Sequence, residues 1–151
     1  MNLMHYLENA KTSLFRWEAL QEYKVEEDDD LTPWWSFIEE KVAEGVIMQR
    51  VRLIKLPLNT YTKDEIESHK ISCEKGDDIQ CILQPKFSVE NFNDFWLIDE
   101  KIVLNMNYSD DGEYRGFEVE ENQSVLDDYL NFKKELLSHS KSIMDFNNKE
   151  N

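Results

Sequence analysis

Two arginines near the middle of the chain have the residue type and spacing of a binding site. Arg50 and Arg52 stand two positions apart in the segment 46–58, whose alternating aliphatic residues predict a strand. Side chains two apart on a strand point to the same face, so both guanidinium groups are expected to project together. Such a pair can grip a phosphate or a carboxylate. The alternative is a solvated or salt-bridged sheet face.

Carboxylates near the predicted strands offer a second kind of chemistry. Asp94, Asp99 and Glu118 lie in or beside these strands, and Glu65 lies on the helix expected to connect two of them. An acidic cluster can hold a divalent metal for phosphodiester chemistry. The chain has 32 acidic residues, however, so several near a sheet edge are expected by chance. We therefore predict no metal site and no cofactor.

The candidate ligand- or partner-binding residues come from these observations and from the aromatic residues beside them. Trp96 is either a core residue or a stacking platform, and the core is the commoner role. The candidate set is Arg50, Arg52, Tyr61, Glu65, Asp94 and Trp96. A shared concave pocket would indicate a binding site.

The three histidines do not form a recognisable catalytic motif. His139, Lys141 and Asp145 resemble the His-x-Lys-x4-Asp signature of phospholipase D enzymes, in which the histidine is the nucleophile and the lysine binds phosphate. Here the aspartate comes one residue early. The segment also ends a predicted helix, where residues two apart point in different directions. No catalytic residue is predicted.

Composition limits the possible functions. The chain has 151 residues and a net charge of −15, which argues against direct nucleic-acid binding because that depends on Lys and Arg. No segment has the apolar length of a membrane helix, and the N-terminus does not resemble a signal peptide. We expect a cytoplasmic protein with Cys73 and Cys81 as buried thiols. The acidity fits simple solubility, a basic partner or DNA mimicry.

The first part of the chain is predicted to be helical. Thr32 and Pro33 have the residue types of a helix start, and Gly45 suits its left-handed end. This helix should turn Trp34 or Trp35, Ile38 and Val42 inward. In chain order, the predicted elements are a helix over 3–14, its continuation or a second helix over 15–23, an exposed acidic loop over 26–30, and the helix from Thr32 to Gly45.

The remainder predicts a βαβ unit, a meander and a final helix. Thr62 and Glu65 have the spacing of a capping box, and Gly76 ends that helix. The predicted elements are strands over 46–58 and 78–84 around the capped helix, then strands over 95–98, 102–108 and 114–119, then a helix beginning at Ser124. The two strands of the βαβ unit should be parallel.

These elements predict one domain over residues 1–146, followed by a frayed polar tail over 147–151. The expected fold class is α/β, bordering on α+β. It has a mixed sheet of about five strands, with N-terminal helices and a C-terminal helix packed on it.

A series of short motifs in this order resembles the DUF6879 family of uncharacterised bacterial domains. The match extends over nearly the whole chain and departs from the family in the acidic loop at 26–30. The matching residues are Phe15, Glu18 and Tyr23; Arg50, Val51 and Arg52; Pro57, Leu58, Tyr61 and Glu65; Gly76, Asp78 and Ile79; residues 94–99; and Met106, Tyr108, Gly112, Gly116 and Phe117.

The resemblance implies little biochemistry by itself. Its element order is similar to one half of a phospholipase D enzyme without the catalytic motif. Genes of the family often lie beside those of helix-turn-helix regulators, which implies a regulatory or toxin–antitoxin role. The first hypothesis is therefore a non-catalytic regulatory or interaction module with a protein partner, such as a DNA-binding regulator. The alternatives are a phosphodiester-processing enzyme that uses Arg50, Arg52 and the sheet-edge carboxylates, and an acidic DNA-mimic inhibitor.

Overall fold

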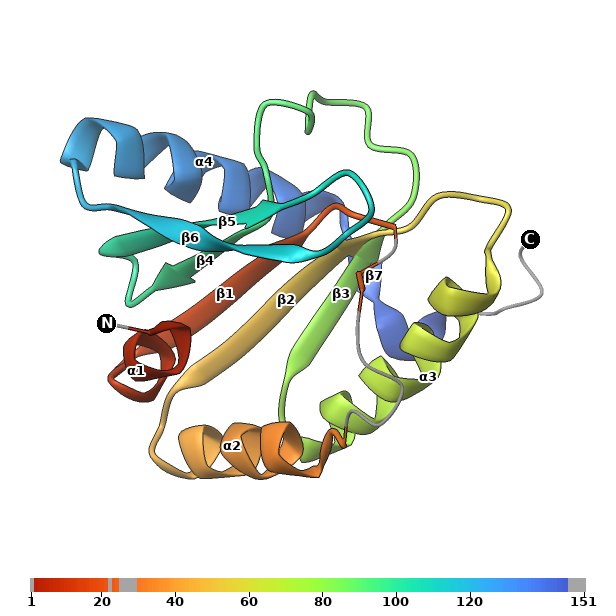
Figure 1. The fold of residues 1–151 in the computed structure, drawn as a ribbon, viewed down its shortest axis with the longest axis horizontal. Helices are drawn as coiled ribbons and strands as arrows, with labels where there is room; N and C mark the ends of the chain where they lie inside the picture. The colour runs from red at the N-terminus through yellow and green to blue at the C-terminus, as the bar shows by residue number, and fades with distance from the viewer. Residues whose placement is uncertain (1, 22, 25–29, 147–151) are drawn as a thin grey trace.

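A mixed seven-stranded sheet forms the centre of the domain (Figure 1). The computed structural model describes residues 2–21, 23–24 and 30–146. The strands are β1 (Ser13–Glu18), β2 (Ile47–Leu53), β3 (Asp78–Ile82), β4 (Phe95–Ile98), β5 (Ile102–Tyr108), β6 (Tyr114–Glu120) and β7 (Lys141–Ser142). They are arranged in the order β6-β5-β4-β1-β2-β3-β7. The mixed α+β class is confirmed, whereas the expected number of about five strands is too low.

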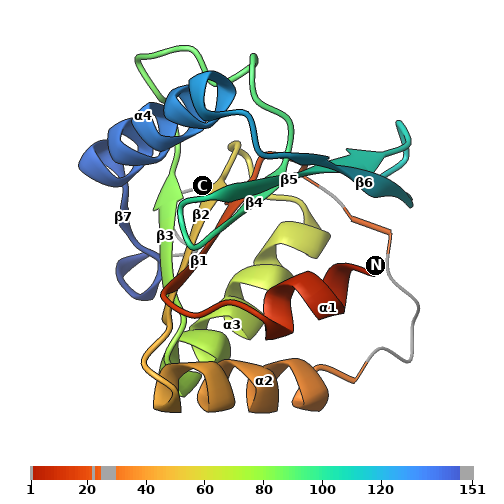
Figure 2. The ribbon, with the colours of Figure 1, turned by 90° about the vertical axis from the view of Figure 1, so that its left-hand side faces the viewer.

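Helices cover both faces of the sheet (Figure 2). They are α1 (Leu3–Glu8), α2 (Thr32–Ala43), α3 (Thr60–Lys75) and α4 (Gln123–His139), with a short 3-10 helix η1 (Ile143–Asp145) after β7. On one face, α4 packs Phe132 and Leu136 against Trp17 and Phe95. The other face is covered by α1, α2 and α3. This second face carries most of the buried charge.

The helix predicted over residues 15–23 is wrong, because residues 13–18 form the strand β1. This strand pairs in parallel with β2 and antiparallel with β4, so it lies inside the sheet. Phe15 and Trp17 enter the core on the α4 face, while Arg16 and Glu18 are buried on the opposite face. A strand that is buried on both faces has no exposed polar side. In the sequence, its buried charged residues can therefore be mistaken for the exposed polar face of a helix. The helix predicted over 3–14 is correspondingly shorter.

The predicted βαβ unit and meander are confirmed. The strands β2 and β3 are parallel and are connected through α3, while β4, β5 and β6 form an antiparallel meander. The added strand β7 is two residues long and pairs antiparallel with β3. Cys81 is buried, as expected, whereas Cys73 is only partly buried. The acidic residues 26–29 and the tail 147–151 lie outside the described residues.

The predicted helix caps differ from those of the structure. The sequence pattern selects Thr32, Thr62 and Ser124, whereas the structure has Leu31, Asn59 and Asn122 at these positions. In α3, the side chain of Asn59 accepts a hydrogen bond from the Thr62 N–H at 2.7 Å. The carboxylate of Glu65 does not reach back to the helix start, because it pairs with Arg52. A distant charge therefore overrides the local capping box.

One prediction for α2 is also wrong. Val42, expected to point inward, is 39% exposed, while Phe37 and Ile38 are buried. Val42 lies instead beside Gly76, the left-handed C-cap of α3. The predicted glycine ends are confirmed, since Gly45 and Gly76 both have positive φ.

Candidate functional site

Charged side chains gather on the face of the sheet that α1, α2 and α3 cover. The parallel register sets Arg16 beside Arg50 and Glu18 beside Arg52, so the two strands present four charges to one face. The helix α3 and the segments before β3 and β4 supply the rest. We refer to the following residues as the buried charge network: Arg16, Glu18, Arg50, Arg52, Glu65, His69, Asp77 and Asp94.

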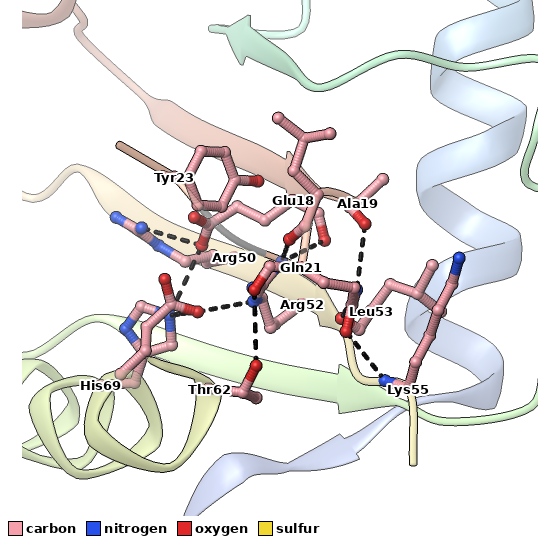
Figure 3. Close-up of polar contacts among 12 residues, drawn as sticks. Glu18, Ala19, Gln21, Tyr23, Arg50, Arg52, Leu53, Lys55, Thr62 and His69 are labelled. Atoms are coloured by element: carbon pink, nitrogen blue, oxygen red, sulfur yellow. Dashed lines mark hydrogen bonds and ion pairs between the residues drawn. The ribbon is translucent and has the colours of Figure 1, made fainter. Parts of the chain in front are cut away.

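Each of the two arginines of β2 is paired with carboxylates (Figure 3). Arg50 Nη1 donates to Glu18 Oε1 at 2.9 Å, and Arg50 Nε lies 3.6 Å from Asp77 Oδ2. Arg52 Nε donates to Glu65 Oε1 at 2.6 Å, and its Nη1 donates to the Leu20 carbonyl oxygen. The salt-bridged alternative of the sequence analysis therefore describes this sheet face.

A second branch of the network joins β1 to the start of β4. Arg16 Nη2 lies 3.2 Å from Asp94 Oδ2 and donates to the Tyr108 hydroxyl at 2.8 Å. Asp94 also accepts hydrogen bonds from the Tyr23 hydroxyl and, at 3.0 Å, from the Ala19 N–H. Asp94 thus fastens the segment that follows β1 to the sheet.

Aromatic rings cover the guanidinium groups. Arg50 lies 5.7 Å from the centroid of Trp34 and 5.8 Å from that of Trp96. Arg16 packs on Trp96, and Arg52 lies 5.3 Å from the ring of Tyr23. Contacts of this kind stabilise desolvated cations. Trp96 is 6% exposed, so it is a core residue that packs against Arg16 and Arg50.

His69 occupies the space between two carboxylates. Its Nε2 atom lies 3.6 Å from Oε1 of both Glu18 and Glu65, and it has no hydrogen-bond partner within the described part of the chain. One ligand atom from each of these three residues falls within 4.8 Å of the others, a spacing that can hold a metal ion. The same two Oε1 atoms already accept hydrogen bonds from Arg50 and Arg52. Arg50 and Arg52 therefore supply the positive charge that a metal ion would supply at these carboxylates.

Burial and neighbouring charges shift the pKa values of the network in opposite directions. Burial opposes ionisation of Glu18, but the charge of Arg50 outweighs it and holds the pKa of Glu18 well below its usual range. Burial, followed by the charge of Glu18, raises the pKa of Glu65. Burial, helped by the arginines, lowers the pKa of His69 to about 3. Burial raises the pKa of Asp77 to about 6. His69 is therefore neutral at pH 7.

The six candidate binding residues share a neighbourhood but not an open pocket. Arg50, Arg52 and Glu65 pair within the network, and Tyr61 interacts with Glu65 one helical turn away. Asp94 belongs to the branch around Arg16. The six residues thus lie around one largely buried region. Arg52 and Tyr61 both contact Glu65, whereas Arg50 and Asp94 pair with residues outside the candidate set.

Four network residues are missing from the candidate set. Arg16 and Glu18 alternate with Phe15 and Trp17, a period of two that could have indicated a buried strand. His69 lies four residues after Glu65, a helical spacing that places both side chains on one face. Asp77 follows the glycine that ends α3, and no local pattern distinguishes it from other acids.

The histidine segment near the C-terminus is divided among three elements. His139 ends α4 and its Nδ1 lies 2.9 Å from the Glu135 carbonyl oxygen, Lys141 lies on β7, and Asp145 lies on η1. None of these three residues belongs to the buried charge network.

A cavity of about 510 Å³ lies beside the network, at the carboxyl ends of β1, β2 and β3. Leu20, Leu53, Phe87, Phe92 and Tyr108 line it. Asp94 is the one candidate binding residue in its lining among the described residues. The cavity is mixed in polarity, and its boundary with the network is the Asp94 carboxylate.

Comparison with known proteins identifies the family. Residues 1–148 match the profile of a domain of unknown function, DUF6879. The chain belongs to the DUF6879 family. A search of curated proteins gave no significant match. Among the described residues, no helix of this DUF6879 domain has the length and apolar character needed to cross a membrane.

Solved structures show where else this fold occurs. The DUF6879 domain is similar to the crystal structure of a phospholipase D family member, Nuc from Salmonella typhimurium, with a TM-score of 0.56. The two chains are 13% identical, and the match covers 92% of this chain and 86% of that one. At this identity the similarity establishes a phospholipase-D-like fold and leaves the activity open.

Proposed function

We propose that this DUF6879 domain is a non-catalytic interaction module that binds a protein partner. The observation that carries the proposal is the internal pairing of the inward-facing arginines. Arg16, Arg50 and Arg52 each contact a carboxylate that is buried or, for Glu65, largely buried, so each guanidinium already has an anionic partner. A site that grips a substrate phosphate needs donors that the phosphate can reach. The guanidinium nitrogens that lack a hydrogen-bond partner among the described residues, Arg16 Nη1, Arg50 Nε and Arg52 Nη2, are buried.

The chemistry of the partner follows from the charge of the chain. A net charge of −15 favours association with a basic surface and accelerates it by electrostatic steering. Two kinds of partner fit the regulatory role implied by the family: a helix-turn-helix regulator, and the other component of a toxin–antitoxin pair. Both are proposals about the partner's class.

A phosphodiester-processing enzyme is the second candidate, and the fold match with a phospholipase D family member favours it. In that case, Glu18, Glu65 and His69 would provide the polar groups nearest to the two arginines of β2. Freeing those arginines would require breaking buried ion pairs, which costs several kcal/mol. This cost is why we rank the enzyme second.

Reconstitution with a purified partner tests the first proposal. Proteins that co-purify with the tagged domain from its native host would be identified, expressed separately and titrated by calorimetry. We expect saturable 1:1 binding that weakens as NaCl increases. Failure to find any partner that binds again in purified form would refute the interaction module.

Activity assays test the enzyme. Purified protein would be incubated with bis(p-nitrophenyl) phosphate and plasmid DNA, with and without Mg²⁺, Mn²⁺ or Zn²⁺. We expect no turnover above that of folded Arg52→Ala and Asp94→Ala variants. Turnover that both variants abolish would instead establish the phosphodiester-processing function.

A further inference from the structure

The outer strand of the meander has an unpaired side. Within the described part of the chain, β6 pairs with β5 and with no other strand, and it ends the sheet. Its residues Tyr114 and Val119 are 45% and 41% exposed. Alternate residues of such an edge direct their backbone N–H and C=O groups away from the sheet, where another strand can bind them.

The two faces of β6 differ in chemistry. Val119 lies opposite Leu104, and Phe117 lies opposite Met106, so both share the α1 face. Glu118 and Glu120 alternate with them and therefore lie on the α4 face. The edge strand thus presents apolar side chains on one face and carboxylates on the other.

Negative charge is concentrated along this edge. The segment from Asp110 to Glu121 contains six acidic residues and one arginine, a net charge of −5. Arg115 lies 3.7 Å from the Glu113 carboxylate, so its positive charge is offset locally. A second copy of the chain would bring an equally acidic strand to the edge, and like charges opposite one another destabilise a strand pair.

The middle of β6 is uncrowded at Gly116. Gly116 has φ of +98°, and a Cβ atom added there would meet no heavy atom within 4 Å. Its positive φ accompanies the bulge opposite residues 106–108. A glycine in a strand can also permit close backbone approach.

We propose that β6 binds an extended basic segment of the partner as an eighth strand. Lysine or arginine at alternate positions would pair with Glu118 and Glu120, and the intervening apolar residues would cover Phe117 and Val119. Backbone hydrogen bonds provide affinity in this mode, and the alternating side chains provide specificity. This inference rests on the proposed interaction function and names its surface and ligand class.

A synthetic peptide tests the strand addition directly. The probe is a fluorescein-labelled octapeptide of alternating lysine and valine, and its control has the same composition in two blocks, Lys4Val4. Binding would be followed by fluorescence anisotropy, and exchange of the β6 amides by hydrogen–deuterium exchange NMR. We expect the alternating peptide to bind more tightly and to protect amides of residues 114–120. Equal binding of both peptides, or absence of protection, overturns the proposal.

Charge-reversal variants separate this edge from the overall charge. Glu118→Lys combined with Glu120→Lys should weaken alternating-peptide binding about tenfold or more, as expected for close charge pairs. Glu40→Lys combined with Glu74→Lys changes two exposed glutamates on α2 and α3, and this control has the same net charge as the β6 double variant. The control should weaken binding at most about twofold, because charges far from β6 attract the peptide only at long range and salt screens that attraction. Equal losses in the two variants overturn the β6 surface.

The same variants keep this inference separate from the proposed function. If a purified partner binds the wild type and both double variants equally, the interaction module is supported and the β6 surface is refuted. If no partner exists, the proposed function fails, whatever the peptide does. Denaturation midpoints would confirm that both double variants are folded.

Discussion

At the scale of single residues, Arg16, Arg50 and Arg52 are paired with carboxylates of the same chain. Arg52 has no exposed surface, and its Nε lies 2.6 Å from the Glu65 carboxylate. Buried ion pairs contribute little net stability compared with apolar residues, but loss of one partner leaves an uncompensated charge. The network is therefore expected to constrain the positions of β1, β2 and α3 strongly.

Removal of the Arg52 side chain should destabilise the domain severely. In Arg52→Ala, Glu65 remains largely buried without its cation, and we expect a loss of about 3–5 kcal/mol in the free energy of unfolding. Urea denaturation at pH 7 measures it. The double variant Arg52→Met, Glu65→Leu should recover part of this loss, because it removes both charges. An undiminished loss in the double variant would contradict the pairing.

His69 should make the stability of the domain depend on pH. Its pKa is about 3 in the folded chain and about 6.5 when unfolded, because burial opposes its charged form. The unfolded chain therefore binds the proton first, and acidification from pH 6.5 toward pH 3 favours unfolding. The stabilisation associated with neutral His69 is present above pH 6.5 and is lost as the pH decreases.

Comparison with His69→Gln isolates this effect, since the carboxylates titrate in both proteins. Between pH 6.5 and pH 4, the wild type should lose stability relative to the variant by about 1.4 kcal/mol per pH unit at most. Chemical denaturation at several pH values measures the difference. A wild type that gains stability relative to the variant on acidification would indicate a protonated His69 between Glu18 and Glu65.

At the scale of elements, the ends of helices fix how α2 and α3 meet. Gly76 ends α3 with φ of +118°, and a Cβ atom there would lie 2.8 Å from Val42 Cγ2 on α2. Gly45 ends α2 with φ of +91°, and a Cβ atom there would meet nothing within 4 Å. The two glycines therefore share a conformational requirement, while steric restriction affects Gly76 alone.

Alanine substitutions should distinguish these two requirements. Gly45→Ala should cost about 1–2 kcal/mol, the penalty for a left-handed residue with a Cβ atom. Gly76→Ala should cost more, because the added methyl group also collides with Val42. A Val42→Ala background should remove the additional cost at Gly76 and leave the cost at Gly45 unchanged. Equal costs for the two glycines in the wild-type background would show that the α2–α3 contact yields easily.

At the scale of the whole molecule, acidity acts mainly outside the core. The buried charge network matches three arginines with four acidic residues, so most of the net charge of −15 lies elsewhere. Repulsion among exposed carboxylates destabilises the compact state and is screened by salt. The same exposed charge is available to a basic partner. The DNA-mimic hypothesis depends on this charge as well and stays a prediction.

Salt should therefore stabilise the isolated domain. Raising NaCl from about 10 mM to about 500 mM should increase the free energy of unfolding on the order of 1 kcal/mol, because it shortens the screening length severalfold. Urea denaturation at both salt concentrations measures the change. The destabilisation by Arg52→Ala serves as the control and should vary little with salt, since its ion pair is buried. A domain that becomes less stable in salt would contradict net surface repulsion.

The sequence by itself determined the elements whose signals are local. The glycine ends of α2 and α3, the βαβ unit and the turns of the meander follow from neighbouring residues, and all are present in the structure. The family motifs, which extend along most of the chain, also identified DUF6879. The acidity on which the proposal of a basic partner rests is likewise a property of composition.

Only the tertiary structure decided that residues 13–18 form a strand and that the arginines are paired with carboxylates. Glu18 and Arg50 are 32 positions apart, and their contact exists only because β1 inserts between β4 and β2. Charges buried in that strand obscured its pattern, since charge normally marks an exposed face. The candidate Arg50 and Arg52 were therefore found from their spacing, whereas their neutralisation depended on partners that only folding brings together.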